Sequence, residues 1–233
     1  MRKEIFISTI LLSFVNLLFG QEHLSIFRVP NTDIGLESSQ WASLEKYSFD
    51  GIANDFFSTS STFELNDLMI DLKIGWNDKG LLFNVLWKDD VVDYTRITKG
   101  NAIIKDADGN RRDKMYFYDN MEIKLVNDDF IYESWWSISD LIYQWHSLRV
   151  KENDQWQSEL TPRPNFEKDI DEKEVRLFVQ IEWEVLGFEA PANKGINLIF
   201  VVSDSDQPEQ SIDNKMSERT PYVSMTKKLL LEE

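Results

Sequence analysis

The sequence predicts an all-β protein, an antiparallel β-sandwich with long loops. Hydrophobic and polar residues alternate with a period of two in several separate runs, which is typical of strands that bury one face. Turn-forming residues divide these runs, and little helical periodicity lies between them. Two layers of strands packed around an apolar interior satisfy such a pattern.

The clearest run is a β-hairpin at residues 72–90. Two alternating stretches flank the turn sequence Asn77-Asp78-Lys79-Gly80, which favours a tight reversal of the chain. A later run at 175–183 alternates in the same way. The residues on the hydrophobic side of these strands are the predicted core, namely Leu72, Ile74, Trp76, Leu81, Phe83, Val85, Trp87, Val179, Ile181 and Trp183.

Other segments complete the predicted architecture. Residues 120–125, 196–202 and 222–231 are expected to be strands, and the nearly continuous apolar run at 196–202 indicates a central one. Apolar residues at helical spacing over 138–147 are compatible with one short helix, although the same residues also fit a strand. The polar stretches 93–118 and 151–173 are predicted to be long loops, where binding groups commonly lie.

The N-terminus indicates export. Arg2 and Lys3 precede an apolar run that ends at Gly20, and this order is typical of a secretory signal peptide comprising residues 1–20. The run is short for a membrane anchor, so we expect no membrane insertion of the mature chain. Residues 21–233 contain no linker-like segment and are predicted to form a single domain in the periplasm or outside the cell.

Charge and composition exclude several partners and chemistries. The chain has a formal net charge of −16 and no basic cluster, so nucleic acid is not an expected partner. It contains no cysteine, which excludes disulfides, thiolate metal sites and attachment through a lipidated cysteine. An exported protein without disulfides fits a bacterial periplasm or exterior better than a eukaryotic secretory route.

Five segments follow one another along the predicted mature chain in a distinctive order. An extended segment leads to Trp41, the hairpin ends in an acidic pair, and an aspartate-led strand follows. A late strand with a tryptophan then enters a leucine-glycine turn, and a glycine-led strand ends in acidic residues. The five segments are IFRVPNTDIGLESSQW, Asp89-Asp90, DNMEIKL, VQIEWEVLGFEAP and GINLIFVVSDSD. In this order they resemble the family 9 carbohydrate-binding modules and their DOMON-like relatives.

The resemblance implies a non-catalytic saccharide-binding protein, for which a glycan-degrading enzyme encoded elsewhere is a candidate partner. Sugars are held by stacking on aromatic rings and by polar groups that bond their hydroxyls. The tryptophans that strand alternation does not assign to the core are the predicted stacking platform, with core packing as the alternative for each. These candidates are Trp135, Trp136, Trp145 and Trp156.

Acidic residues suggest a metal. Asp204 and Asp206 follow a buried strand at close spacing, and hard oxygen ligands suit calcium, which the resemblance also makes plausible as a structural ion. A solvated turn is the alternative for this pair. A structural role, in which carboxylates bond turn amides and strand-edge groups, is the expectation for Asp89, Asp90, Asp119 and Glu122.

Nothing in the sequence singles out a catalytic centre. There are only two histidines, His23 and His146, and any carboxylate pair can be chosen from 41 acidic residues. One alternative function is haem binding of the DOMON-like type, which requires axial ligands drawn from residues such as Met115, Met121, His146 and Met216. The other alternative is an extracytoplasmic interaction or structural domain.

Overall fold

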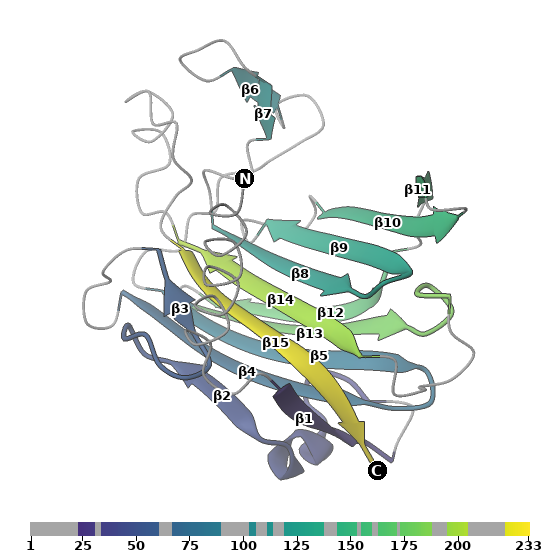
Figure 1. Cartoon of the computed structure of the whole chain (residues 1–233). Helices are drawn as coiled ribbons and strands as arrows, with labels where there is room; N and C mark the ends of the chain where they lie inside the picture. Colours follow the sequence, from purple (N-terminus) through teal and green to yellow (C-terminus); the bar gives the residue numbers. More distant parts are fainter. Residues whose placement is uncertain are drawn as a thin grey trace, which may run out of the picture.

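Strands dominate the chain, and one large sheet contains nearly all of the described ones (Figure 1). The computed structural model describes residues 23–30, 34–60, 67–89, 103–105, 111–113, 119–137, 144–152, 155–159, 163–171, 173–187, 195–204 and 222–233. In chain order its elements are β1 (His23–Arg28), the 3-10 helix η1 (Ser39–Ser43), β2 (Lys46–Phe49), β3 (Ser58–Thr59), β4 (Leu68–Trp76), β5 (Gly80–Asp89), β6 (Ile103–Lys105), β7 (Arg111–Asp113), β8 (Asn120–Val126), β9 (Phe130–Ser137), β10 (Gln144–Glu152), β11 (Gln155–Glu159), β12 (Asn165–Asp171), β13 (Glu174–Glu182), β14 (Ile196–Ser203) and β15 (Tyr222–Glu232).

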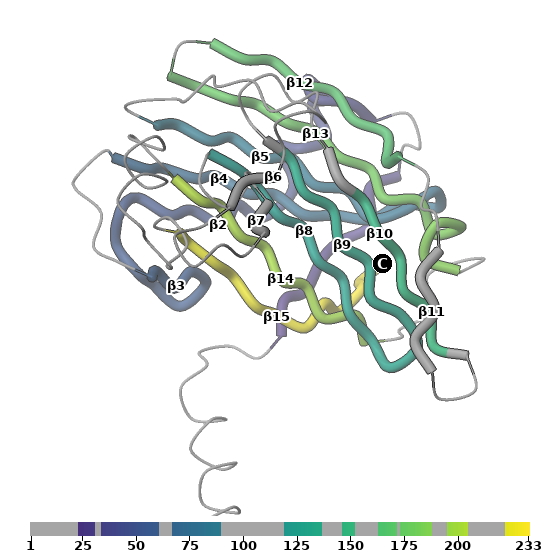
Figure 2. Tube along the Cα trace, turned by 90° about the horizontal axis from the view of Figure 1, so that it is seen from above, coloured from purple at the N-terminus to yellow at the C-terminus, as the bar shows by residue number. Residues whose placement is uncertain are grey.

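The sheet curls into two facing layers. Its strand order is β11-β10-β9-β8-β14-β15-β1-β4-β5-β13-β12, with β2 also beside β4 and β3 beside β15. One layer contains β8, β9, β10, β14 and β15, and the other contains β4, β5, β13 and β12 (Figure 2). The predicted all-β sandwich is therefore confirmed. The sheet is mixed, however, because β1 joins the layers and runs parallel to both β15 and β4.

Alternating hydrophobic residues fill the space between the layers. All ten predicted core residues belong to the main buried apolar cluster. Inward residues of β8, β9 and β14 reach this cluster from the other layer, and the rings of Trp136 and Phe166 meet across it with centroids 5.1 Å apart. A smaller cluster covers the outer face of β5 and β13, where Trp41 packs edge-on against Phe178.

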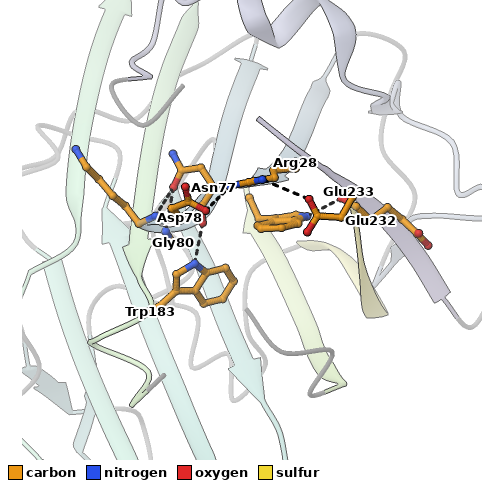
Figure 3. Close-up of polar contacts among 9 residues, drawn as sticks. Arg28, Asn77, Asp78, Gly80, Trp183, Glu232 and Glu233 are labelled. Atoms are coloured by element: carbon orange, nitrogen blue, oxygen red, sulfur yellow. Dashed lines mark hydrogen bonds and ion pairs between the residues drawn. The ribbon is translucent and has the colours of Figure 1, made fainter. Parts of the chain in front are cut away.

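The β4–β5 turn closes one end of the sandwich (Figure 3). The Asn77 side-chain oxygen accepts hydrogen bonds from the Lys79 and Gly80 amides, and the Trp183 indole donates to the Asn77 carbonyl oxygen at 2.8 Å. A Cβ at Gly80 would lie 2.1 Å from the Ile181 carbonyl oxygen, so this close approach of β5 to β13 requires glycine. We call the region of the sandwich that contains these contacts the closed end.

Several predicted boundaries differ from the structure. Residues 151–173, predicted to be loop, include β11 and β12, because these outer strands of the sheet carry mostly polar residues and lack hydrophobic alternation. Likewise, β6 and β7 form a separate small hairpin within 93–118. Residues 144–147 belong to β10 and are not helical, while 138–143 and the predicted signal peptide lie outside the described residues. No helix among the described residues is long and apolar enough to cross a membrane.

Candidate functional site

Three strands continue their inward alternation into an aspartate at the end opposite the β4–β5 turn. Asp89 ends β5, Asp119 precedes β8 and Asp204 follows β14. Because side chains on one face of a strand recur every two residues, each aspartate lies on the core side of its strand. They come two positions beyond the apolar core residues Trp87, Met121 and Val202.

The three carboxylates converge. One oxygen from each lies within 4.8 Å of the other two, and the residues are only 3%, 1% and 5% exposed, respectively. Buried like charges at this separation repel strongly, so the arrangement favours either a bound cation or retained protons. Carboxylate oxygens are preferred ligands of calcium, and this acidic triad fits such an ion. We call this region, with its buried neighbours Asn120 and Ser203, the acidic end.

Sequence reasoning found only part of this cluster. Asp204 was predicted as a metal ligand together with Asp206, which lies outside the described residues. The structure instead brings Asp204 together with Asp89 and Asp119, for which the sequence suggested purely structural roles. The sequence signal that could have predicted this cluster was one aspartate at the end of the hydrophobic alternation in each of three strands.

The outer face at the same end carries an aromatic and acidic pair. Trp135 on β9 lies opposite Glu122 on β8, which in turn lies opposite Val201 on β14. Trp135 is 8% exposed and Glu122 is 7% exposed, and Trp135 belongs to neither apolar cluster. The structure therefore provides a tryptophan beside a carboxylate on the side of the sheet that faces away from the core.

The other three predicted platform residues have different positions. Trp136 faces the core and is fully buried, with edge-on contacts to His146 and Phe166, so its ring presents no face to a ligand here. Trp145 occupies the register position opposite Trp135, on β10. Trp156 on β11 lies opposite Lys151 of β10. Lys151 is six positions, or about 20 Å, further along β10 than Trp145, so Trp156 lies apart from the other tryptophans.

Comparisons with known proteins identify the architecture. No family model matches the sequence, and no curated protein matches it. A family 9 carbohydrate-binding module from Caldicellulosiruptor kristjanssonii in complex with cellotriose superposes with a TM-score of 0.55 and 13% identity, covering 90% of this chain and 93% of that one. The chain has the fold of the family 9 carbohydrate-binding modules.

Two further solved structures are similar to the chain over nearly its whole length. A structure from Caldicellulosiruptor kristjanssonii in complex with glucose has a TM-score of 0.54 and 14% identity, and covers 90% of this chain and 95% of that one. A proposed carbohydrate-binding protein from Bacteroides uniformis has a TM-score of 0.55 and 12% identity, with 91% and 99% covered. Because the likeness extends over nearly the whole of each chain, the predicted resemblance is confirmed at the level of fold.

One hydrogen-bonded serine and histidine lie inside this family 9 fold. The Ser134 hydroxyl and His146 Nδ1 are 2.9 Å apart on neighbouring strands. Burial, reinforced by the nearby charge of Arg163, lowers the pKa of His146 to about 4, so its ring is neutral at physiological pH. Ser134 is fully buried beside Tyr132, and a substrate could not reach it as a nucleophile.

The haem alternative gains no support from these observations. Met121 is 1% exposed within the apolar core, and His146 Nδ1 is engaged by Ser134. Met115 and Met216 lie outside the described residues.

Proposed function

We propose that this chain is a non-catalytic carbohydrate-binding protein. Its fold is shared, over 90% of its length, with modules whose structures contain cellotriose or glucose. A shared fold at such low identity does not fix the ligand, so the proposal also depends on the chemistry of the site. The observation that carries it is the outward pair of Trp135 and Glu122.

This pair offers the two kinds of contact that a saccharide needs. The indole of Trp135 presents an apolar surface to the C–H face of a sugar ring, and the Glu122 carboxylate accepts hydrogen bonds from its hydroxyls. Trp145, opposite Trp135 in register, is the proposed second aromatic residue of the site. Small rotations of the Trp135 ring would enlarge its exposed area on binding, since side-chain rearrangements at binding sites are common.

Adjacent tryptophans provide a matched test. A glycan array on the purified chain identifies a ligand, and tryptophan fluorescence titration then measures its affinity. We expect Trp135→Ala to weaken binding at least about tenfold and to destabilise the fold less than Trp136→Ala, which removes a ring from the main core cluster. If Trp135→Ala bound the identified glycan as tightly as the parent chain, the site would have to lie elsewhere.

The proposed function includes no hydrolysis. Among the described residues, the serine of the one hydrogen-bonded serine and histidine pair is fully buried, and no carboxylate pair is distinguished as acid and base. We therefore expect no release of reducing sugar from polysaccharides by the purified chain. Sustained release by a contaminant-free preparation would overturn this part of the proposal.

We further propose that the chain is exported and acts beside a glycan-degrading enzyme. The support for export is the charged and then apolar order of residues 1–20. N-terminal sequencing of the protein from its native host should show cleavage near Gly20. Recovery of an intact Met1 from the cytosol would contradict export.

Calcium is the proposed structural ion. Asp89, Asp119 and Asp204 would hold it, supplying oxygen ligands from strands of both layers. Such an ion would neutralise the repulsion among the carboxylates and connect the two layers at the acidic end. The role is one of stability, and no contact between the ion and the saccharide is implied.

A further inference from the structure

A hollow lies on the same layer, away from the Trp135 and Glu122 pair. It is lined by the β8–β9 turn, the start of β14 and the late part of β15, and has a volume of about 320 Å³. Its lining begins at Asn127, five residues and about 17 Å along the strand direction from Glu122. The lining residues are Asn127, Asp128, Asp129, Gly195, Asn197 and Lys228.

Hydrogen bonds hold the acidic side of this hollow in place. The Asn127 side-chain oxygen accepts from the Asp129 and Phe130 amides, each at 2.8 Å. The Lys151 amide donates to the Asp129 carbonyl oxygen, and Phe130 is buried in the core beneath. The turn is therefore fixed to three strands, with Asp128 and Asp129 exposed at its surface.

A glycine positions the basic side. Gly195 has a φ of +59°, and a Cβ there would lie 3.1 Å from Cε and 3.5 Å from Nζ of Lys228. Its lack of a side chain lets the lysine run close to the backbone at the entrance to β14. Asn197 lies opposite Lys228 in register, so an amide and an ammonium group stand side by side.

These groups are available to a ligand. In the part of the chain that the structure describes, the side chains of Asp128, Asn197 and Lys228 make no hydrogen bond or ion pair with the protein. Together they supply acceptors, donors and one amide that does both, which matches hydroxyl groups. No aromatic residue lines the hollow, so binding here would be purely polar.

The charge of the lining and the volume of the hollow restrict the class of ligand that it can bind. The lining carries two carboxylates and one ammonium, and the whole chain is at −16, so an anionic ligand is disfavoured, while Lys228 opposes a metal ion. The volume suits one sugar unit. We propose that this hollow is a second saccharide subsite that binds a single neutral sugar residue. The inference rests on the proposed carbohydrate-binding function and adds a separate location to it.

The test is an NMR titration of the full chain with glucose and cellotriose, with glucuronate as the anionic comparison. We expect the Gly195 and Asn197 backbone amides to shift with the neutral sugars and less with glucuronate. In Asn197→Ala and Lys228→Met the apparent Kd from the Gly195 signal should rise about fivefold or more, the scale of one lost hydrogen bond. Thr226→Ala, an exposed change on β15 outside the hollow, is the control.

The outcomes separate the two sites. Shifts at the hollow that persist in Trp135→Ala support a second, independent subsite. Shifts at the Trp135 indole with none at Gly195 or Asn197 would overturn the subsite and leave the proposed function intact. Shifts at the hollow alone would support the subsite and remove the Trp135 site, and the absence of shifts at either place with every sugar would contradict both.

Discussion

Buried polar groups are arranged in opposite ways at the two ends of the sandwich. At the closed end, polar groups face partners of opposite hydrogen-bonding character, as where the Trp183 indole donates to the Asn77 carbonyl oxygen (Figure 3). At the acidic end, three carboxylates of like charge meet within 4.8 Å. The first arrangement stabilises the fold without any ligand, whereas the second favours a bound cation.

This difference separates structure from function. At the closed end, hydrogen bonds and close packing are sufficient to hold the strands in register around the turn. The acidic end instead contains clustered buried carboxylates, which cost stability when no ligand is bound. The Trp135 and Glu122 pair lies on its outer face. Features of this kind are typical of binding regions.

The largest expected effect is at the closed end. Trp183→Ala removes a core indole and its hydrogen bond to Asn77, and should lower the free energy of unfolding by about 3–5 kcal/mol. Chemical denaturation measures this change, and Trp135→Ala serves as the comparison. Equal losses in the two variants would contradict the assignment of one tryptophan to structure and the other to binding.

Calcium should stabilise the acidic end. At a concentration 100-fold above its Kd, calcium should raise the free energy of unfolding by about 2.7 kcal/mol, and chelation should reverse this. Asp204→Asn should reduce the response and, without calcium, should stabilise the chain by relieving repulsion. A melting temperature that changes with neither calcium nor chelator would contradict a calcium site at the acidic end.

A further prediction tests the close packing of strands at Gly80 in the closed end. In Gly80→Ala the new Cβ would collide with the Ile181 carbonyl oxygen, and we expect a loss of about 1–3 kcal/mol in denaturation experiments. Gly187→Ala is the control, because Gly187 has a φ of +75° but no atom within 4 Å of the Cβ position. A smaller loss in Gly80→Ala than in Gly187→Ala would show that the strands separate easily there.

The last prediction concerns the pH dependence of stability. Burial keeps the pKa of His146 near 4 in the folded state against an ordinary 6.5, so the unfolded chain binds more protons between these values. Stability from neutral His146 is complete above about pH 6.5 and is lost as the pH falls toward 4. Denaturation at pH 7 and pH 4 should therefore show a smaller acid-induced loss in His146→Gln, and an unchanged loss would contradict the burial of this ring.

The sequence predicted the strands whose inward faces are apolar. Alternation identified β4, β5 and β13 with all ten core residues, because each of these strands contributes a continuous inward row of apolar residues to the core. It missed β11 and β12, where mostly polar residues at the outer edge of the sheet give no period of two. Local pattern is therefore informative only where one face of a strand is buried.

The site was harder to predict because it depends on contacts between distant strands. Asp204 was recognised, but its partners Asp89 and Asp119 come from other strands, and only the register and curl of the sheet bring them together. Adjacent Trp135 and Trp136 were predicted to face opposite ways, as they do, yet sequence alone could not say which one faces the core.

The most direct test of the central claim is a binding measurement on the parent chain and Trp135→Ala. Calorimetric titration with the glycan selected on an array, together with cellotriose and glucose, gives affinity and stoichiometry for both proteins. We predict saturable binding by the parent chain and at least about tenfold weaker binding by Trp135→Ala, with a smaller loss of unfolding free energy than in Trp136→Ala. No binding to any neutral saccharide by the folded parent chain would contradict it.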